Sequence, residues 1–408
     1  MGLSLFLVIA PNHAARADTP ARSQVKGEMT LVDGLRVLRV WGTPREKGFA
    51  QGYLLGQDGI NLLDSDLKDD KHGIGAYEGL SKQLLTKMKV ARPYQEEMEG
   101  MVEGFKARLG GHVTIPSLSR DLEYRDLLAM NCVPETAQLG CSSFAAWGAM
   151  TANGETLSGR NLDWFSQPAL KDSGGYPLVV MYPPEDGNVG WISVTWPLYV
   201  GCLTGMNAQG VTVSMHDVMG VPASESSNLT PRGFALREAI EGAHAETASE
   251  DITRILRGLR PMVGNNVPVS MPYTGHGSGS VVFEYDGNQD KDGGVTVRAT
   301  EPGSAFYQIC TNDYRKRAKA VWCERYAKMR DRLKEAKAEG KKLGIDDAWE
   351  LLDGVAMEGW ILTYQSVVFE PNRKLMHIKI AGAGGKKATG QKAVTLDVAK
   401  LLTPASSP

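Results

Sequence analysis

The fold of this chain is decided by the run LGCSSFAAWGAMTANGETLSGRNLDW, which spans Leu139 to Trp164. Two segments rich in strand-forming residues flank Asn153-Gly154, a dipeptide typical of hairpin turns. The returning segment brings Arg160 and Asp163 back towards Cys141, which directly follows a glycine. The sequence therefore predicts a β-hairpin that gathers a thiol, a cation and a carboxylate.

A simple turn does not give this hairpin the register it needs. A two-residue turn at Asn153-Gly154 would place Asp163 opposite Phe144, three residues beyond Cys141. A β-bulge or a wider loop is needed to bring Asp163 beside the cysteine. We therefore expect one of these two irregularities in the hairpin.

Composition excludes several classes of partner. The chain has 408 residues with 45 basic and 47 acidic side chains, so no charge excess points to nucleic acid or to an anionic membrane surface. The 46 glycines exceed the average share of about 7% and favour tight turns and short strands over a helical bundle.

The N-terminus has features of an export signal. Leu3 to Ala10 form a short apolar run, and Ala15-Arg16-Ala17 fits a small-x-small cleavage site, although a basic n-region is missing. We expect residues 1–17 to be a signal peptide and the protein to be exported, to the periplasm or the medium. If this signal does not function, the protein is cytoplasmic. No other stretch reaches about 18 apolar residues, so we expect no membrane span.

The first 140 residues are predicted to be mainly helical. Thr43, Pro44 and Glu46 form a capping-box start for a helix that runs into the sixties. Residues 92–110 carry apolar side chains at helical spacing and end at two glycines, and 121–135 reads as a shorter helix.

The pattern changes at Cys141, where short strand-like runs begin. Two helices are predicted near 233–260, a basic helix over Tyr314 to Lys341, and a closing hairpin that turns at Pro371-Asn372. The irregular alternation predicts an α+β fold with antiparallel sheets, in which residues 18–408 form one domain.

The sequence contains no metal or phosphate motif. The five cysteines form no CxxC pair and have no zinc-like spacing with histidine; they are Cys132, Cys141, Cys202, Cys310 and Cys323. An odd count in an exported protein leaves at least one thiol unpaired within the chain. We predict neither a cofactor nor a metal.

A cut between Gly140 and Cys141 would give one residue both a thiol nucleophile and an α-amine base with an ordinary pKa near 8. A nearby cation would favour the thiolate, an acceptor would hold the amine, and donors would stabilise the oxyanion. Arg160 is a candidate for the cation and Asp163 for the acceptor. The alternative is that these two residues form a surface ion pair on a strand.

Taken together, these motifs resemble those of the Cys-type N-terminal-nucleophile (Ntn) hydrolases. GRNLDW after GCSSF is similar to their signature, in the acyl-coenzyme A:6-aminopenicillanic acid acyltransferase (peptidase C45-like) branch and in the choloylglycine hydrolases. GTPREKGFAQG, TGMNAQGVTVS, CTNDY and VVFEPNRKLMHIKIAG resemble further segments of the family in the expected order. The resemblance covers most of the chain from about Leu35 to Ala381.

The resemblance implies a four-layer αββα sandwich with two packed antiparallel sheets. It implies that Cys141 is the nucleophile and processing point, that Asp163 holds the α-amine and that Arg160 tunes the thiol. Asn207 and Asn312 match positions that orient the amine or donate to the oxyanion. The alternatives are that Asn207 belongs to a plain hairpin turn and that Asn312 caps a helix.

Two positions stay open. The family's C-terminal arginine has no clear counterpart, because Arg373 lies in a hairpin turn and is expected to face solvent. His216, in the segment SMHDV, either lines the pocket or is a core histidine.

These features lead to a functional hypothesis. We expect an autoprocessed amidohydrolase that cleaves linear amides of small molecules through an acyl-thioester on Cys141. Residues 18–140 would be a propeptide or small subunit, and residues 141–408 the catalytic segment; the two would stay associated, and a homo-oligomer is left open. The alternatives are an acyltransferase that uses an amine acceptor, and a non-catalytic exported protein that binds a ligand or is a scaffold held by disulfides.

Overall fold

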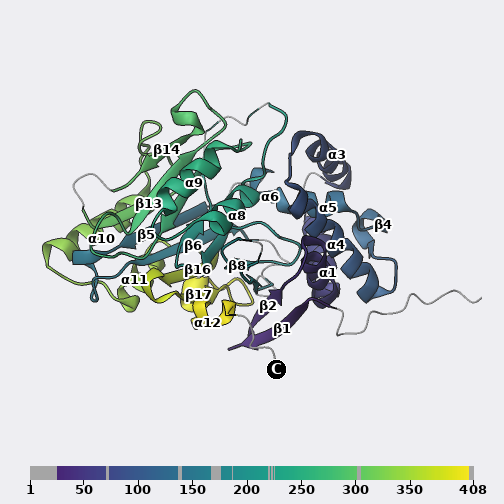
Figure 1. Cartoon of the computed structure of the whole chain (residues 1–408), viewed down its shortest axis with the longest axis horizontal. Coiled ribbons are helices and arrows are strands. Elements are labelled where there is room, and N and C mark those ends of the chain that lie inside the picture. The colour runs from purple at the N-terminus through teal and green to yellow at the C-terminus, as the bar shows by residue number, and fades with distance from the viewer. Residues whose placement is uncertain are drawn as a thin grey trace, which may run out of the picture.

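A computed structural model describes residues 25–69, 73–136, 140–166, 176–185, 187–218, 221, 224, 226–300 and 305–403. The predicted signal peptide lies outside the described residues. Figure 1 shows two β-sheets with helices on their outer faces, and the helices of the N-terminal segment gathered at one end.

Within the described residues, ten strands form the larger sheet. In order across the sheet they are β1 (Gly27–Val32), β2 (Leu35–Val40), β7 (Leu178–Tyr182), β8 (Trp191–Thr195), β9 (Thr204–Asn207), β10 (Thr212–Ser214), β12 (Asn265–Ser270), β13 (Ser280–Tyr285) and β14 (Val295–Arg298), with β11 (His216–Asp217) paired to β12.

The smaller sheet holds the hairpin predicted from the sequence. Its order is β15 (Tyr307–Cys310), β5 (Gly140–Ala146), β6 (Leu157–Phe165), β16 (Ile361–Glu370), β17 (Leu375–Ile380) and β18 (Val394–Asp397). The closing hairpin is β16–β17, joined at Pro371–Arg373. A separate short pair is formed by β3 (Thr114–Ile115) and β4 (Arg120–Asp121).

The two sheets pack face to face, and helices cover their outer faces. One shared apolar cluster contains Ile192 and Met206 of the larger sheet with Val367 and Phe369 of the smaller one. The larger sheet contacts α8 (Arg232–Gly242) and α9 (Ala248–Arg257), and the smaller one contacts α10 (Glu324–Ala338) and α11 (Ile345–Asp353). The α+β class and the four-layer αββα sandwich are confirmed.

One strand pair departs from the antiparallel expectation. β2 and β7 pair in parallel, while the other pairs of both large sheets are antiparallel within the described residues. A parallel pair needs a long crossover connection. The chain between β2 and β7 supplies it, since it includes the N-terminal helices and the β5–β6 hairpin.

The N-terminal segment is helical, as predicted. Its helices are α1 (Pro44–Leu55), α2 (Gln57–Asp69), α3 (Gly73–Lys87), α4 (Arg92–Leu109), α5 (Tyr124–Asn131) and α6 (Val133–Thr136). The capping box of Thr43 and Glu46 is present. The predicted first helix divides into α1 and α2 at Gly56, whose φ of 53° is unfavourable for other residues.

The basic helix begins later than predicted. Tyr314 is not helical, and α10 starts at Glu324. The buried Glu284 carboxylate accepts hydrogen bonds from the backbone N–H groups of Arg315, Lys316 and Arg317, which holds this segment as a loop. A local sequence pattern cannot reveal a buried partner that is distant in the chain.

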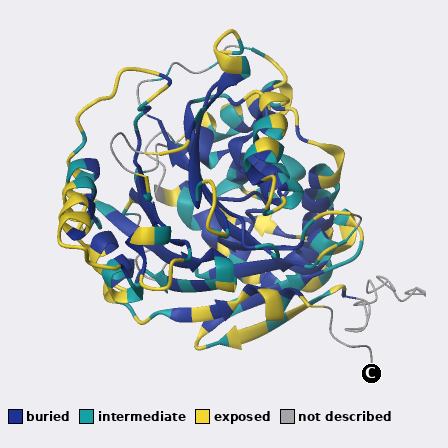
Figure 2. Cartoon of the chain, turned by 60° about the vertical axis from the view of Figure 1, so that its left-hand side comes forward, coloured by how far each residue is buried: buried dark blue, intermediate teal, exposed yellow. Residues whose placement is uncertain are grey.

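Burial follows the layers. Figure 2 shows that buried residues fill both sheets, whereas exposed residues lie mainly on loops and on the outer sides of helices. α12 (Val398–Leu402) ends the described chain. Among the described residues, no helix is both long and apolar enough to cross a bilayer.

α1 and α4 lie unusually close because glycines line their contact. A Cβ at Gly52 would lie 2.1 Å from the Met101 carbonyl oxygen, and one at Gly104 would lie 2.1 Å from the Phe49 carbonyl oxygen. Backbone atoms cannot move aside as a flexible side chain can. The two helices therefore depend on glycine at these positions.

We predict that Gly52→Ala lowers the free energy of unfolding by about 1–3 kcal/mol, because the added methyl group forces the helices apart. Gly79→Ala is the matched control: Gly79 lies in α3 with no atom within 4 Å of an added Cβ. There the gain in helix propensity is up to about 1 kcal/mol. Chemical denaturation of the full chain measures both; equal effects of the two variants would contradict the tight α1–α4 contact.

Candidate active site

The register of the β5–β6 hairpin places Gly140 opposite Asp163 and Cys141 opposite Leu162. The strands are joined by a wider loop over 147–156 rather than by a two-residue turn. This loop contains the 3-10 turn Gly148–Met150, and Thr151 bridges to Leu343. Of the two irregularities expected from the sequence, the structure contains the wider loop.

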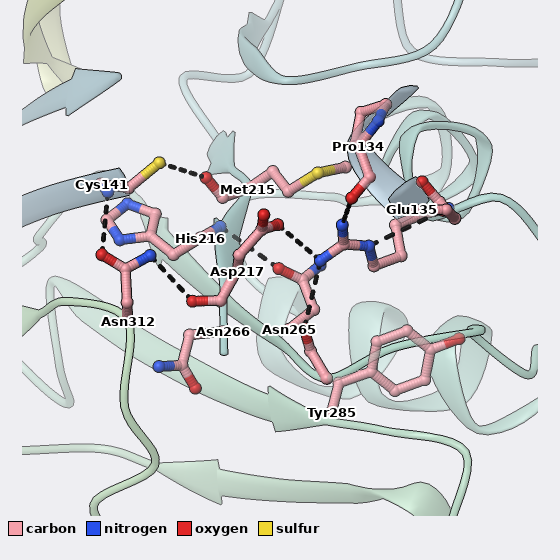
Figure 3. Close-up of polar contacts among 12 residues, drawn as sticks. Pro134, Glu135, Cys141, Met215, His216, Asp217, Asn265, Asn266, Tyr285 and Asn312 are labelled. Atoms are coloured by element: carbon pink, nitrogen blue, oxygen red, sulfur yellow. Dashed lines mark hydrogen bonds and ion pairs between the residues drawn. The ribbon is translucent and has the colours of Figure 1, made fainter. Parts of the chain in front are cut away.

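Cys141 is fully buried, with its sulfur among polar groups. The Sγ atom lies 3.1 Å from Arg160 Nη2 and 3.3 Å from the Met215 carbonyl oxygen. Burial raises the pKa of the Cys141 thiol to about 12, and Arg160 acts in the opposite direction. In the uncut chain the thiol is therefore protonated near neutral pH and donates to the Met215 carbonyl (Figure 3).

Arg160 is held rigidly beside the sulfur. Its Nη1 donates to the Thr204 hydroxyl and its Nη2 to the Met215 carbonyl oxygen, 2.9 Å away. The side chain is 1% exposed. A fixed, desolvated guanidinium stabilises a thiolate more strongly than a solvated one, because water does not screen the attraction.

Asp163 packs directly against Gly140, the residue before Cys141. A Cβ at position 140 would lie 3.1 Å from Asp163 Cβ, so glycine gives this contact its room. The Asp163 carboxylate accepts from Thr363 Oγ1 at 2.6 Å and from Arg325 Nη1 at 3.1 Å. Burial raises the pKa of Asp163, and Arg325 and Thr363 oppose that rise.

Asn312 holds the backbone of Cys141. Its Oδ1 accepts the Cys141 N–H at 2.9 Å, and its Nδ2 donates to the Asp217 carbonyl oxygen at 2.8 Å (Figure 3). The alternative that Asn312 caps a helix is wrong, because the next helix begins at Glu324 after Cys323.

Asn207 is placed apart from these four residues. Its Nδ2 donates to the carbonyl oxygens of Ile240 and Ala243, and its Oδ1 accepts from the N–H groups of Gln209 and Val211. These bonds close the β9–β10 turn and tie it to the end of α8. The geometry therefore matches the alternative of a hairpin turn.

Sequence reasoning missed Arg325. Its Nη1 donates to the Cys141 carbonyl oxygen at 2.7 Å as well as to Asp163, and its Nη2 donates to Asn312 Oδ1 at 2.7 Å. No local motif marks this arginine, which reaches the site only because the 311–323 loop ends there. Arg373 is half-exposed and pairs with Glu155 and Glu370, as expected for a turn residue.

A second buried charge cluster adjoins the site. Arg232, at the start of α8, donates from Nη1 to Asp217 Oδ1 at 2.6 Å, and its backbone N–H donates to Glu135. Its Nη2 donates to the Pro134 carbonyl oxygen. The cluster links the segment before Gly140 to strand β11. Burial raises the pKa of Glu135 to about 7, against the effect of Arg232.

An apolar cavity of about 60 Å³ lies beside the hairpin. Both segments line it, with Leu62, Asp66, Met130, Val133 and Pro134 from one and Trp164, Trp196, Pro197, Tyr199 and Leu203 from the other. Two lining residues connect the cavity to the surroundings of Cys141. Trp164 directly follows Asp163 in the chain, and the Leu203 carbonyl accepts a hydrogen bond from the N–H of Met215. A smaller cavity of about 20 Å³ lies between the sheets and is too small for a substrate.

The remaining chemistry of the site is that of thiols and charges. Among the described residues, no cluster of histidine, cysteine and carboxylate side chains is arranged to hold a metal ion. None of the five cysteines, all of which lie in the described part of the chain, forms a disulfide, so no cross-link supports the alternative of a scaffold held by disulfides.

No protein-family model matches the chain. Protein dcd1A of Dictyostelium discoideum is 25% identical over 256 residues, which cover 55% of this chain and 54% of the relative. Protein dcd1B of the same organism is 25% identical over 223 residues, which cover 50% of this chain and 42% of the relative. The chain thus spans about half the length of these curated relatives.

Three solved structures show a likeness. An N-acylethanolamine-hydrolyzing acid amidase ortholog of Caenorhabditis elegans is 19% identical, covering 57% of this chain and 93% of that one, with a TM-score of 0.41. A mutant of conjugated bile acid hydrolase from Clostridium perfringens is 11% identical, and the match covers 64% of this chain and 93% of that one, with a TM-score of 0.43. Penicillin V acylase from Agrobacterium tumefaciens is 15% identical, and the match covers 59% of this chain and 83% of that one, with a TM-score of 0.40.

We predict that Glu135 makes the protein less stable as pH rises. The raised pKa means that the native state keeps the Glu135 proton between pH 4.5 and about 7, while the unfolded chain releases it. The contribution of Glu135 to the free energy of unfolding is therefore fully present below pH 4.5. It falls by roughly 3 kcal/mol as the pH rises to about 7. Thermal unfolding across this range, compared with Glu135→Gln, measures the effect, and parallel curves for the two proteins would contradict it.

Proposed function

We propose that this protein is an N-terminal-cysteine amidohydrolase that first cuts itself between Gly140 and Cys141. The observation that carries the proposal is the setting of Cys141: its sulfur faces Arg160, its backbone nitrogen is held by Asn312, and Asp163 packs on the preceding glycine. A structural cysteine needs none of these partners, since buried free thiols are usually inert.

Once the chain is cut, Cys141 carries an α-amine that can take the thiol proton. Asn312 Oδ1 already accepts a hydrogen bond from this nitrogen, so the amine would be oriented as soon as it forms. Asp163 and Arg325 flank the same backbone. The thiolate, stabilised by Arg160, attacks the substrate carbonyl. The amide C–N bond then breaks, and the protonated α-amine returns its proton to the leaving amine. Water hydrolyses the acyl-thioester that remains.

The cavity beside the hairpin supports a substrate with an apolar acyl group. Two tryptophans, Trp164 and Trp196, lie nearly perpendicular to each other there, with ring centroids 6.1 Å apart. Such a wall binds hydrocarbon or aromatic groups through burial of apolar surface. We therefore propose N-acyl amides with an apolar acyl group as the substrate class.

The two segments would remain together after the cut. Arg237 of α8 pairs with Glu97 of α4 at 2.8 Å, and its guanidinium stacks over Tyr94 and Tyr182. These contacts are buried and do not depend on the peptide bond at position 140. We propose hydrolysis rather than acyl transfer because the N-terminal pattern predicts export, away from intracellular acyl-coenzyme A donors.

We predict that Cys141→Ala abolishes both self-cleavage and amide hydrolysis, because it removes the nucleophile of each reaction. Scaled by length, the 44.2 kDa chain divides at residue 140 into parts of about 15 and 29 kDa. Wild-type protein should show both bands on a denaturing gel, with Cys141 at the start of the larger, and the variant a single band. Cys323→Ala is the control and should behave as wild type. Hydrolysis retained by Cys141→Ala would place the nucleophile elsewhere.

A second prediction concerns the acyl pocket. Leu62→Ala enlarges the wall that the N-terminal segment contributes, so longer or bulkier acyl groups should gain about 10-fold in kcat/KM relative to short ones. A series of N-acyl amino acids of increasing acyl length measures this. Leu85→Ala, at an exposed position of α3, is the matched control. An unchanged preference in Leu62→Ala would exclude this cavity as the acyl site.

A further inference from the structure

His216 is a buried histidine beside the nucleophile that the proposed hydrolysis does not use. It lies in β11 between Met215, whose carbonyl meets the Cys141 sulfur, and Asp217, whose carbonyl meets Asn312. β11 packs against β5, the strand that carries Cys141, and Figure 3 draws the His216 imidazole on the side of Cys141 and Asn312. The side chain is 0% exposed.

The imidazole is buried with the Thr311 backbone as a weak partner that falls short of full hydrogen-bond geometry. Among the described residues, neither Nδ1 nor Nε2 has a partner with hydrogen-bond geometry. Leaving a buried polar group unsatisfied costs about 1–3 kcal/mol. A core position that needed only volume would be filled at lower cost by an apolar side chain.

The uncut chain lacks a base at the place where cleavage requires one. The nitrogen of Cys141 is then an amide that donates to Asn312 and cannot accept a proton. Asp163 is engaged by Arg325 and Thr363, and Asp217 by Arg232. The α-amine that would serve hydrolysis does not yet exist, so self-cleavage needs a different proton acceptor.

We propose that His216 carries the proton during self-cleavage at Gly140-Cys141, an inference that rests on the proposed function. The imidazole takes the proton of the Cys141 thiol as sulfur bonds to the Gly140 carbonyl carbon. When the C–N bond breaks, the imidazolium gives that proton to the departing nitrogen of Cys141. The resulting thioester is hydrolysed by water, which yields the Gly140 carboxylate, the free thiol and the α-amine.

The charges around His216 decide its protonation state at rest. Burial lowers the pKa of His216 well below its usual value, Arg160 and Arg325 lower it further, and the Thr311 backbone raises it. The imidazole therefore stays neutral in the resting chain. Transfer of a proton from thiol to imidazole creates an ion pair without adding net charge to the buried site, whereas loss of that proton to solvent would leave an unpaired buried anion.

The test follows cleavage of the full chain made by cell-free translation with a labelled amino acid. His216→Gln should slow the appearance of the two fragments by at least about 100-fold, the usual contribution of a positioned base. Free imidazole should restore part of the rate in His216→Ala. Hydrolysis by the cleaved fraction of His216→Gln, per titrated Cys141 thiol, should stay at the wild-type rate. His112→Gln, at an exposed position, is the matched control.

A second measurement needs no variant. In wild type, cleavage should keep its rate as pH falls from 8 to 6, because His216 stays neutral beside Arg160, Arg325, Asp217 and Cys141. Hydrolysis by the cut enzyme should fall over the same range as the α-amine, with an ordinary pKa near 8, becomes protonated.

The outcomes separate the two proposals. Cleavage of His216→Gln at the wild-type rate, or a slow cleavage that imidazole does not restore, would overturn the role of His216. An equal loss of rate in both wild-type reactions as pH falls would do the same. If wild-type protein is never cut at Gly140, the proposed processing itself fails.

Discussion

The pairing of β5 with β6 is the constraint on which the site depends. Because side chains alternate along a strand, a shift of one residue would turn Arg160 away from Cys141 and move Asp163 off Gly140. The wide loop between the strands sets this register, and Thr151 ties the loop to Leu343 beyond α10. A segment far along the chain therefore helps to position Cys141.

A second principle is the burial of paired charge. Arg160, Arg232 and Arg237 are each at most 4% exposed. Arg232 and Arg237 are paired with carboxylates, but Arg160 instead meets a thiol, a hydroxyl and a carbonyl oxygen. Its positive charge is thus left available for the sulfur, in a place where water does not screen it. This arrangement costs stability and is consistent with a catalytic use of the thiol.

The two segments on either side of Gly140 share more than a covalent bond. They share an apolar core, the cavity with Trp164 and Trp196, and two buried arginine clusters. The N-terminal segment thus contributes a wall of the proposed acyl site and not only a means of folding. These contacts support the proposal that the segment is retained as a small subunit.

Local patterns in the sequence were enough for much of the fold. The Thr43 capping box, the glycine-terminated α4 and the closing β16–β17 hairpin follow from short-range rules of helix caps and turns. The start of α10 and the parallel β2–β7 pair did not, because Glu284 and a long crossover decide them.

The same division holds for the site. The sequence by itself determined the glycine-cysteine junction and the return of Arg160 and Asp163 on the next strand, since these lie within one hairpin. Only the tertiary structure decided that Arg325 joins them, that Asn207 stays with its turn and that His216 is buried beside Cys141. The reason is physical: a contact between segments distant in the chain depends on how sheets and loops pack, and no local pattern encodes that geometry.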